Sequence, residues 1–164
     1  MQKSNFGESV DDIVKADGHY DREAYYFVRE GLDFTIKMLK KDSRGAKRHV
    51  SGHELLDGLR RFALDEFGPM AKTVLTHWGV KRCEDFGEIV FRMVDKGILG
   101  KTEQDTPEDF KGGFDFEEAF VKPYQPSLRY RSHRPAKSGD GSDERYHRVA
   151  DRTSDTKKLS GGKN

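Results

Sequence analysis

The chain has 164 residues, of which 34% are hydrophobic and 36% are charged, and its formal net charge is +1. This total conceals an asymmetry: residues 1–121 carry 19 Lys and Arg against 24 Asp and Glu, whereas residues 122–164 carry 11 against 5. The composition predicts one acidic domain with a basic tail, and it excludes a membrane-spanning protein because no apolar run approaches the ~18 residues that a spanning helix needs.

The single cysteine, Cys83, rules out a disulfide within the chain and suits a reducing compartment. The first residues, MQKSNFGESV, lack the apolar segment of a secretory signal peptide. We therefore expect a soluble, cytoplasmic protein that has no membrane partner.

The first two predicted helices cover residues 6–16 and 20–40, where apolar residues recur at steps of three and four. In the second segment the apolar stripe widens to two sides, which predicts a long central helix. Asp21 stands where its carboxylate can cap the first N–H groups of this helix.

The next helix begins at a capping box, in which Ser51 and Glu54 each bond the other's backbone N–H. Its apolar face continues to Phe67, where Gly68-Pro69 interrupts it. A short helix over residues 71–78 follows, and Gly79 can adopt the positive φ of its C-terminal cap.

The pattern after Gly79 predicts a helix at about residues 82–95, ended by Gly97. Ile98-Leu99 and residues 114–116 are predicted to form a small β-hairpin around an acidic loop, followed by a helical turn at residues 117–120. The expected fold is mainly α, with a winged-helix-like segment over residues 50–118 in a domain of residues 1–121. Residues 122–164 are expected to be a disordered basic C-terminal tail.

The outward positions of the predicted 82–95 helix suggest a protein-binding surface. These positions are Glu84, Asp85, Glu88 and Arg92, and the loop of the hairpin adds Glu103, Asp105, Glu108 and Asp109. Duplex DNA is bound mainly through Lys and Arg, so we expect no specific duplex DNA binding by this acidic face. The first hypothesis is a non-enzymatic interaction module whose acidic winged-helix-like face binds a basic protein partner.

Catalytic and metal-ligating patterns are weak in this sequence. His49 and His53 are four residues apart, but Ser51 is the predicted N-cap, which leaves His49 outside the helix. Cys83 stands near a helix start but beside Glu84 and Asp85, which oppose a reactive thiolate. We expect no catalytic residues, no metal and no cofactor.

The basic tail supports a second hypothesis. Its segment YQPSLRYRSHRPAK alternates stacking and cationic residues, among them Arg129, Tyr130, Arg131, Arg134 and Lys137. Such segments bind RNA through phosphate contacts and base stacking, which predicts an RNA- or ribosome-associated protein. A solubilising tail, or one that binds the acidic body of its own chain, remains open as an alternative.

Several segments resemble the Minf-type family of uncharacterised small bacterial proteins over about residues 8–120. They are DREAYYFVREGLDFT, HVSGHELLDGLRRFALDEFGPMAKTVLTHWGV, EDFGEIVFRMVDKGIL and FDFEEAF. The resemblance implies a compact bacterial cytoplasmic domain in which the Gly68-Pro69 and Trp78-Gly79 turns belong to the fold. It implies no activity and no functional residues, and it does not extend to the basic tail.

Overall fold

The computed structural model describes residues 5–42 and 49–126, and the part up to Gln125 belongs to one compact unit. This unit is mainly helical. Its elements, in chain order, are α1 (Phe6–Ala16), α2 (Arg22–Asp42), α3 (Gly52–Phe67), the 3-10 turn η1 (Gly68–Met70), α4 (Ala71–His77), α5 (Cys83–Asp95), the 3-10 turn η2 (Pro107–Phe110), α6 (Phe116–Phe120) and the 3-10 turn η3 (Lys122–Tyr124).

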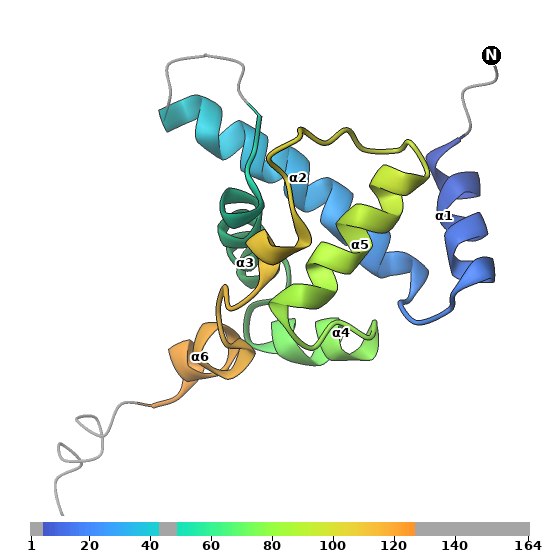
Figure 1. The fold of residues 1–164 in the computed structure, drawn as a ribbon. Helices are drawn as coiled ribbons and strands as arrows, with labels where there is room; N and C mark the ends of the chain where they lie inside the picture. Colours follow the sequence, from blue (N-terminus) through green and yellow to red (C-terminus); the bar gives the residue numbers. More distant parts are fainter. Residues whose placement is uncertain (1–4, 43–48, 127–164) are drawn as a thin grey trace, which may run out of the picture. The chain divides into compact units, whose positions relative to one another are not determined.

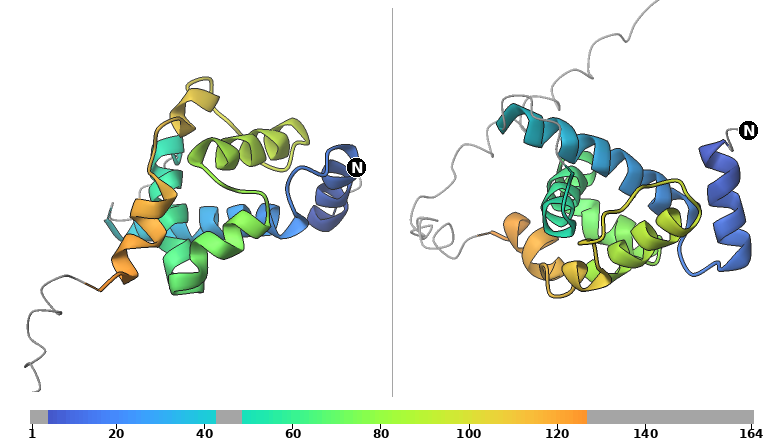
Figure 2. Two further views of the ribbon diagram at one scale, coloured as in Figure 1. Left: turned by 90° about the horizontal axis from the view of Figure 1, so that it is seen from below. Right: turned by 45° about the horizontal axis from the view of Figure 1, so that its top comes forward.

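Helix α2 is the centre of the arrangement, as its wide apolar stripe predicts. Helices α3 and α5 both pack against it, and α1 lies beside it, as the two sets of views show (Figures 1 and 2). Helices α4 and α6 contact each other at the carboxyl end of α3. Phe86 of α5 is fully buried between Phe27 of α2 and Phe116 of α6, with ring centroids 6.2 and 6.0 Å away.

The helix boundaries that depend on local signals are confirmed. The Ser51 hydroxyl accepts from the Glu54 N–H at 3.3 Å, and the Glu54 carboxylate accepts from the Ser51 N–H at 3.0 Å. The Asp21 carboxylate accepts from the Glu23 N–H at 2.9 Å at the start of α2. Gly79 has a φ of 89° at the end of α4. Side-chain acceptors and a positive-φ glycine act within a few residues, so the sequence suffices to locate these ends.

The predicted β-hairpin, and with it the winged-helix-like segment, is wrong for residues 5–42 and 49–126, which contain no strand. Gly97, with a φ of 70°, turns the chain back on α5, so that its N–H donates to Val94 O and that of Ile98 donates to Met93 O, both at 2.9 Å. These two bonds form a Schellman cap, and they occupy the Ile98 N–H, which a strand would need for pairing. Phe116 belongs to α6, which Asp115 caps.

The predicted tail and domain boundary fall partly outside the described residues. Lys122–Tyr124 forms η3 and continues the compact unit, whereas residues from 127 onward are not described. Within the described ranges, no helix combines the length and the apolar character that crossing a membrane requires.

Loss of the Ser51 cap should weaken α3 measurably. The variant Ser51→Ala is expected to lower the free energy of unfolding by about 1 kcal/mol, because the Glu54 N–H loses its acceptor. Urea denaturation followed by circular dichroism measures the change, and Ser51→Asn, which keeps an acceptor, should recover most of it. Equal midpoints for Ser51→Ala and the parent protein would contradict the role of the cap.

Candidate binding site

Asp85, predicted to face outward on α5, is buried, with 6% of its surface exposed. Its Oδ2 accepts from the backbone N–H groups of Lys81 at 2.8 Å and Arg82 at 3.1 Å, and its Oδ1 accepts from the Tyr20 hydroxyl at 2.9 Å. The carboxylate therefore caps α5 and joins it to the segment before α2. The prediction that Asp85 lies on an open surface is wrong, because N-capping turned its side chain inward.

Glu88 and Arg92 continue this network along α5. The Tyr20 hydroxyl lies 2.8 Å from Glu88 Oε2, but a phenol has one proton and donates to one carboxylate at a time. Arg92 pairs with Asp17 at 2.6 Å and lies 3.8 Å from Glu88. Burial, with the hydrogen bonds to Glu88 and Asp85, raises the pKa of the Tyr20 phenol far above its ordinary value, so it stays protonated.

Glu84, the fourth residue of the predicted surface, is half-buried and accepts from the Gly112 N–H at 3.5 Å. The structure thus brings Glu84, Asp85, Glu88 and Arg92 together on α5, but each has a contact within the domain. These contacts hold α5 to its neighbours, which is a structural role. Partner binding by these four residues remains a prediction.

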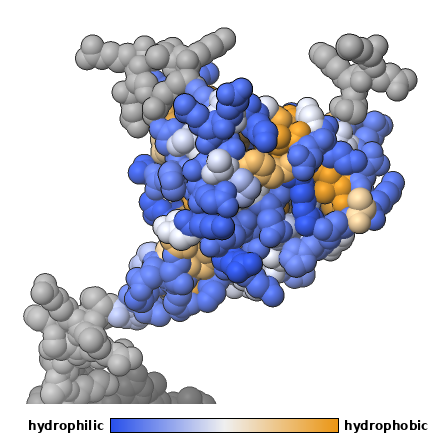
Figure 3. All heavy atoms as spheres, viewed as in Figure 1, coloured by the Kyte–Doolittle hydropathy of each residue, from blue (hydrophilic) through white to orange (hydrophobic). Residues whose placement is uncertain are grey.

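The acidic segment predicted as a hairpin loop lies instead beside an apolar pocket of about 200 Å³. The walls come from α2, the start of α3, α5 and the segment of residues 99–110. They include Leu32, Ile36, Leu55, Val90, Val94 and Phe110. On the face shown in Figure 3, hydrophilic residues predominate and apolar residues reach the surface in small patches.

Polar residues line the mouth of this pocket. His49 Nε2 lies 2.7 Å from Asp105 Oδ2, and the same oxygen accepts from the Thr102 N–H at 2.6 Å. Against the effect of burial, the hydrogen bonds from Thr102 and the contact with His49 lower the pKa of the Asp105 carboxyl. Asp109 accepts from the Thr106 N–H at 2.9 Å. Backbone donors thus hold both carboxylates in place beside the pocket.

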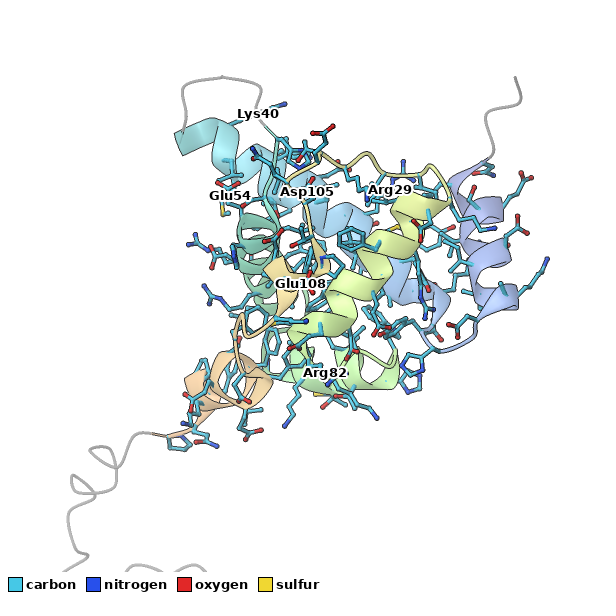
Figure 4. All side chains as sticks on the ribbon, viewed as in Figure 1. Arg29, Lys40, Glu54, Arg82, Asp105 and Glu108 are labelled. Carbon is cyan, nitrogen blue, oxygen red and sulfur yellow. The ribbon has the colours of Figure 1, made fainter. Side chains whose placement is uncertain are left out.

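A wider hollow of about 750 Å³ adjoins the pocket and shares His49, Asp105 and Asp109 with it. Glu54 and Glu103 also line this acidic hollow, and no Lys or Arg is among its lining residues in the described part of the chain. Figure 4 shows Glu54 at the start of α3 and Asp105 on the segment beside it. Lys101 belongs to the pocket wall, with its amino group 5.7 Å from the centre of the Phe91 ring.

His49 and Cys83 both have contacts within the domain. His49 pairs with Asp105, and within the described ranges no three His, Cys, Asp or Glu side chains lie close enough to hold a metal ion. Cys83 Sγ lies 3.3 Å from both the carbonyl oxygen and the N–H of Phe114. Burial raises the pKa of this thiol, which therefore stays protonated.

The sequence reasoning missed the pocket because its walls come from segments far apart in the chain, such as those of Leu32, Val90 and Phe110. The acidic run of residues 103–109 was the one local signal. The predicted RNA-binding residues Arg129, Tyr130, Arg131, Arg134 and Lys137 lie outside the described residues. RNA binding through them therefore remains a prediction.

Comparisons of this chain with protein-family models, with curated proteins and with solved structures give no match. The resemblance to the Minf-type family therefore remains a prediction, and the function is inferred from the geometry of the site.

Proposed function

We propose that this chain is a non-enzymatic interaction module that binds a basic segment of a protein partner. An apolar side chain of the partner enters the pocket between α2, α3 and α5, and its Lys or Arg neighbours lie against the acidic hollow. The surface differs from the one that the sequence suggests on α5, since Asp85 there is buried.

The observation that supports this proposal is the continuity of the apolar pocket with the acidic hollow. They share three residues, His49, Asp105 and Asp109. A pocket of about 200 Å³ is large enough for one apolar side chain, since an engineered protein cavity of roughly 150 Å³ binds benzene. An anchor in a pocket with complementary charge around it is a common basis of specific recognition.

The charge of the domain favours a basic partner over a nucleic acid. Residues 1–121 carry 24 Asp and Glu against 19 Lys and Arg, which repels phosphate groups. At the hollow itself Glu103 is exposed, and the described residues hold no ion-pair partner for it. Its charge is therefore available to a cationic side chain.

Fluorescence anisotropy with labelled synthetic peptides tests the proposal. The probe peptide carries one central Leu flanked by Lys and Arg; one comparison peptide has Glu at the basic positions, and another has Ser in place of Leu. We expect the probe peptide to bind in a salt-dependent manner and at least about tenfold more tightly than either comparison peptide.

Two variants locate the peptide on the domain. Val94→Phe fills the pocket and should weaken binding about tenfold or more, and Glu103→Lys should weaken it about threefold to tenfold. Asp65→Lys, an exposed site at the other end of α3, is the control with the same change in net charge. Unchanged binding by Val94→Phe, or equal binding of the acidic peptide, would refute the proposal.

A further inference from the structure

A second site lies apart from the pocket, where aromatic side chains of α2, α3 and the end of α4 meet in an open groove of about 510 Å³. Tyr26, Phe62, Phe67 and Trp78 line it while half-buried, so part of each ring stays open to solvent. Beneath them Phe27 is buried.

The rings of this aromatic groove hold one another in place. Phe27 stacks on Phe62 with centroids 5.2 Å apart, and its centroid lies 5.8 Å from those of both Phe67 and Trp78. Phe67 and Trp78 meet edge to face at 5.6 Å. A ligand would thus meet preformed aromatic walls and would not have to order them.

The charged side chains around the groove are mostly acidic. Glu23 and Glu30 of α2 and Glu66 of α3 line it, are exposed and form no ion pair within the described ranges. The one cation of the lining, Arg22, is already engaged, with Nε 3.3 Å from Asp11 Oδ1 and Nη2 donating to the Tyr26 hydroxyl at 3.1 Å. The Arg22 guanidinium also lies 5.4 Å from the centre of the Tyr26 ring, so the open aromatic surface is that of Phe62, Phe67 and Trp78. The three carboxylates beside it have no ion-pair partner among the described residues.

The spacing in sequence explains why these groups share one face. On α2, Tyr26 and Phe27 lie three and four residues after Glu23, and Glu30 lies four and three residues after them, so these side chains lie along one side of the helix. Glu66 lies four residues after Phe62 on α3, and the two helices pack against each other. Two acidic-aromatic faces thus border the same groove.

We propose that this aromatic groove binds a small molecule that carries a quaternary ammonium group. Aromatic rings attract cations through their electron-rich faces, and a methylated ammonium gives up its hydration more readily than an inorganic ion. The methyl groups contact the rings while the carboxylates of Glu23, Glu30 and Glu66 neutralise the charge. A divalent metal ion would require a shell of oxygen ligands, which aromatic walls do not supply.

Trp78 provides a direct assay, because it is the only tryptophan of the chain and it lines the groove. Titration with choline should change its fluorescence and reach saturation, with sodium chloride at equal ionic strength as the control. The neutral isostere 3,3-dimethyl-1-butanol should bind at least about fivefold more weakly, since it has the same shape without the charge.

Substitutions of the carboxylates distinguish the contribution of charge to choline binding from the contribution of the groove's shape. Glu30→Gln and Glu66→Gln should each weaken choline binding about twofold to fivefold and leave binding of the neutral isostere unchanged. Asp33→Asn, which removes one exposed carboxylate of α2 outside the groove, should bind choline like the parent protein.

Three results would overturn this proposal: no saturable change in Trp78 emission, equal binding of the neutral isostere, or unchanged choline binding by both glutamine variants. A trimethyllysine peptide serves as a further probe. If it bound more than about tenfold more tightly than choline, contacts beyond the ammonium group would dominate, and the assignment to a small molecule would be wrong. The peptide-binding pocket is a separate site, so Val94→Phe should bind choline normally.

Discussion

Replacement of Gly58 by alanine should destabilise the domain, although alanine is the better helix former. A Cβ atom at this position of α3 would lie 1.8 Å from Oγ1 and 2.7 Å from Cβ of Thr35 on α2. Thr35 is fully buried and its hydroxyl donates to the Gly31 carbonyl at 2.7 Å, so it cannot move aside without losing this bond. We expect Gly58→Ala to lower the free energy of unfolding by about 2–3 kcal/mol, and Gly58→Val by more.

Urea denaturation measures this effect, and two further variants make it specific. Gly100→Ala is the control, because no other side chain or backbone atom lies within 4 Å of its Cβ position. Adding Thr35→Ala to Gly58→Ala removes the closest clash, so the double variant should be less destabilised than the two single effects together. A Gly58→Ala protein as stable as the parent would show that α2 and α3 do not approach this closely.

Replacement of Asp85 by alanine should lower the free energy of unfolding by about 2–4 kcal/mol. The change leaves the N–H groups of Lys81 and Arg82 without their side-chain acceptor, and it removes one of the two carboxylates to which the Tyr20 hydroxyl can donate. The same geometry means that Asp85→Lys would disrupt the fold, so a charge reversal there cannot serve as a test of partner binding.

Thermal and urea denaturation of Asp85→Ala are compared with those of Asp95→Ala, an exposed carboxylate at the other end of α5. The control should change stability by less than about 0.5 kcal/mol. Asp85→Asn keeps one oxygen acceptor, so its loss of stability should lie between those of Asp85→Ala and Asp95→Ala. A loss below about 1 kcal/mol in Asp85→Ala would contradict the buried cap.

The hydrogen bonds and ion pairs around Asp85 also bear on whether α5 can act as a charged binding surface. A helix whose acidic residues bond Tyr20, pair with Arg92 or cap its own start presents little free charge. The carboxylates around the pocket and the aromatic groove differ in this respect, since Glu103, Glu23, Glu30 and Glu66 are exposed and have no ion-pair partner among the described residues. Free charge beside apolar surface, rather than acidic composition alone, distinguishes the two proposed sites.

The helices of this protein follow from local features of its sequence. The apolar period locates α1, α2, α3 and α5, and the capping box at Ser51 and Glu54 marks the start of α3. Glycines at positions 79 and 97 mark the ends of α4 and α5. These signals suffice because each acts through hydrogen bonds or side chains within one or two turns of the helix.

The hairpin prediction failed where a short apolar run had two possible partners. Ile98-Leu99 could pair with another strand or complete the Schellman cap of α5. The cap needs only the carbonyl oxygen of Met93, five residues before Ile98. A strand would need a partner far away in the chain, and closing the loop between them would cost conformational entropy.

Only the tertiary structure decided which charged residues are free and where the sites lie. The sequence by itself determined a mainly helical domain with acidic character, because periodicity, caps and composition are local properties. The burial of Asp85, the close approach of Gly58 to Thr35 and the walls of the pocket and groove all depend on segments distant in the chain. Such contacts arise from helix packing, which fixes side-chain surroundings that no local pattern specifies.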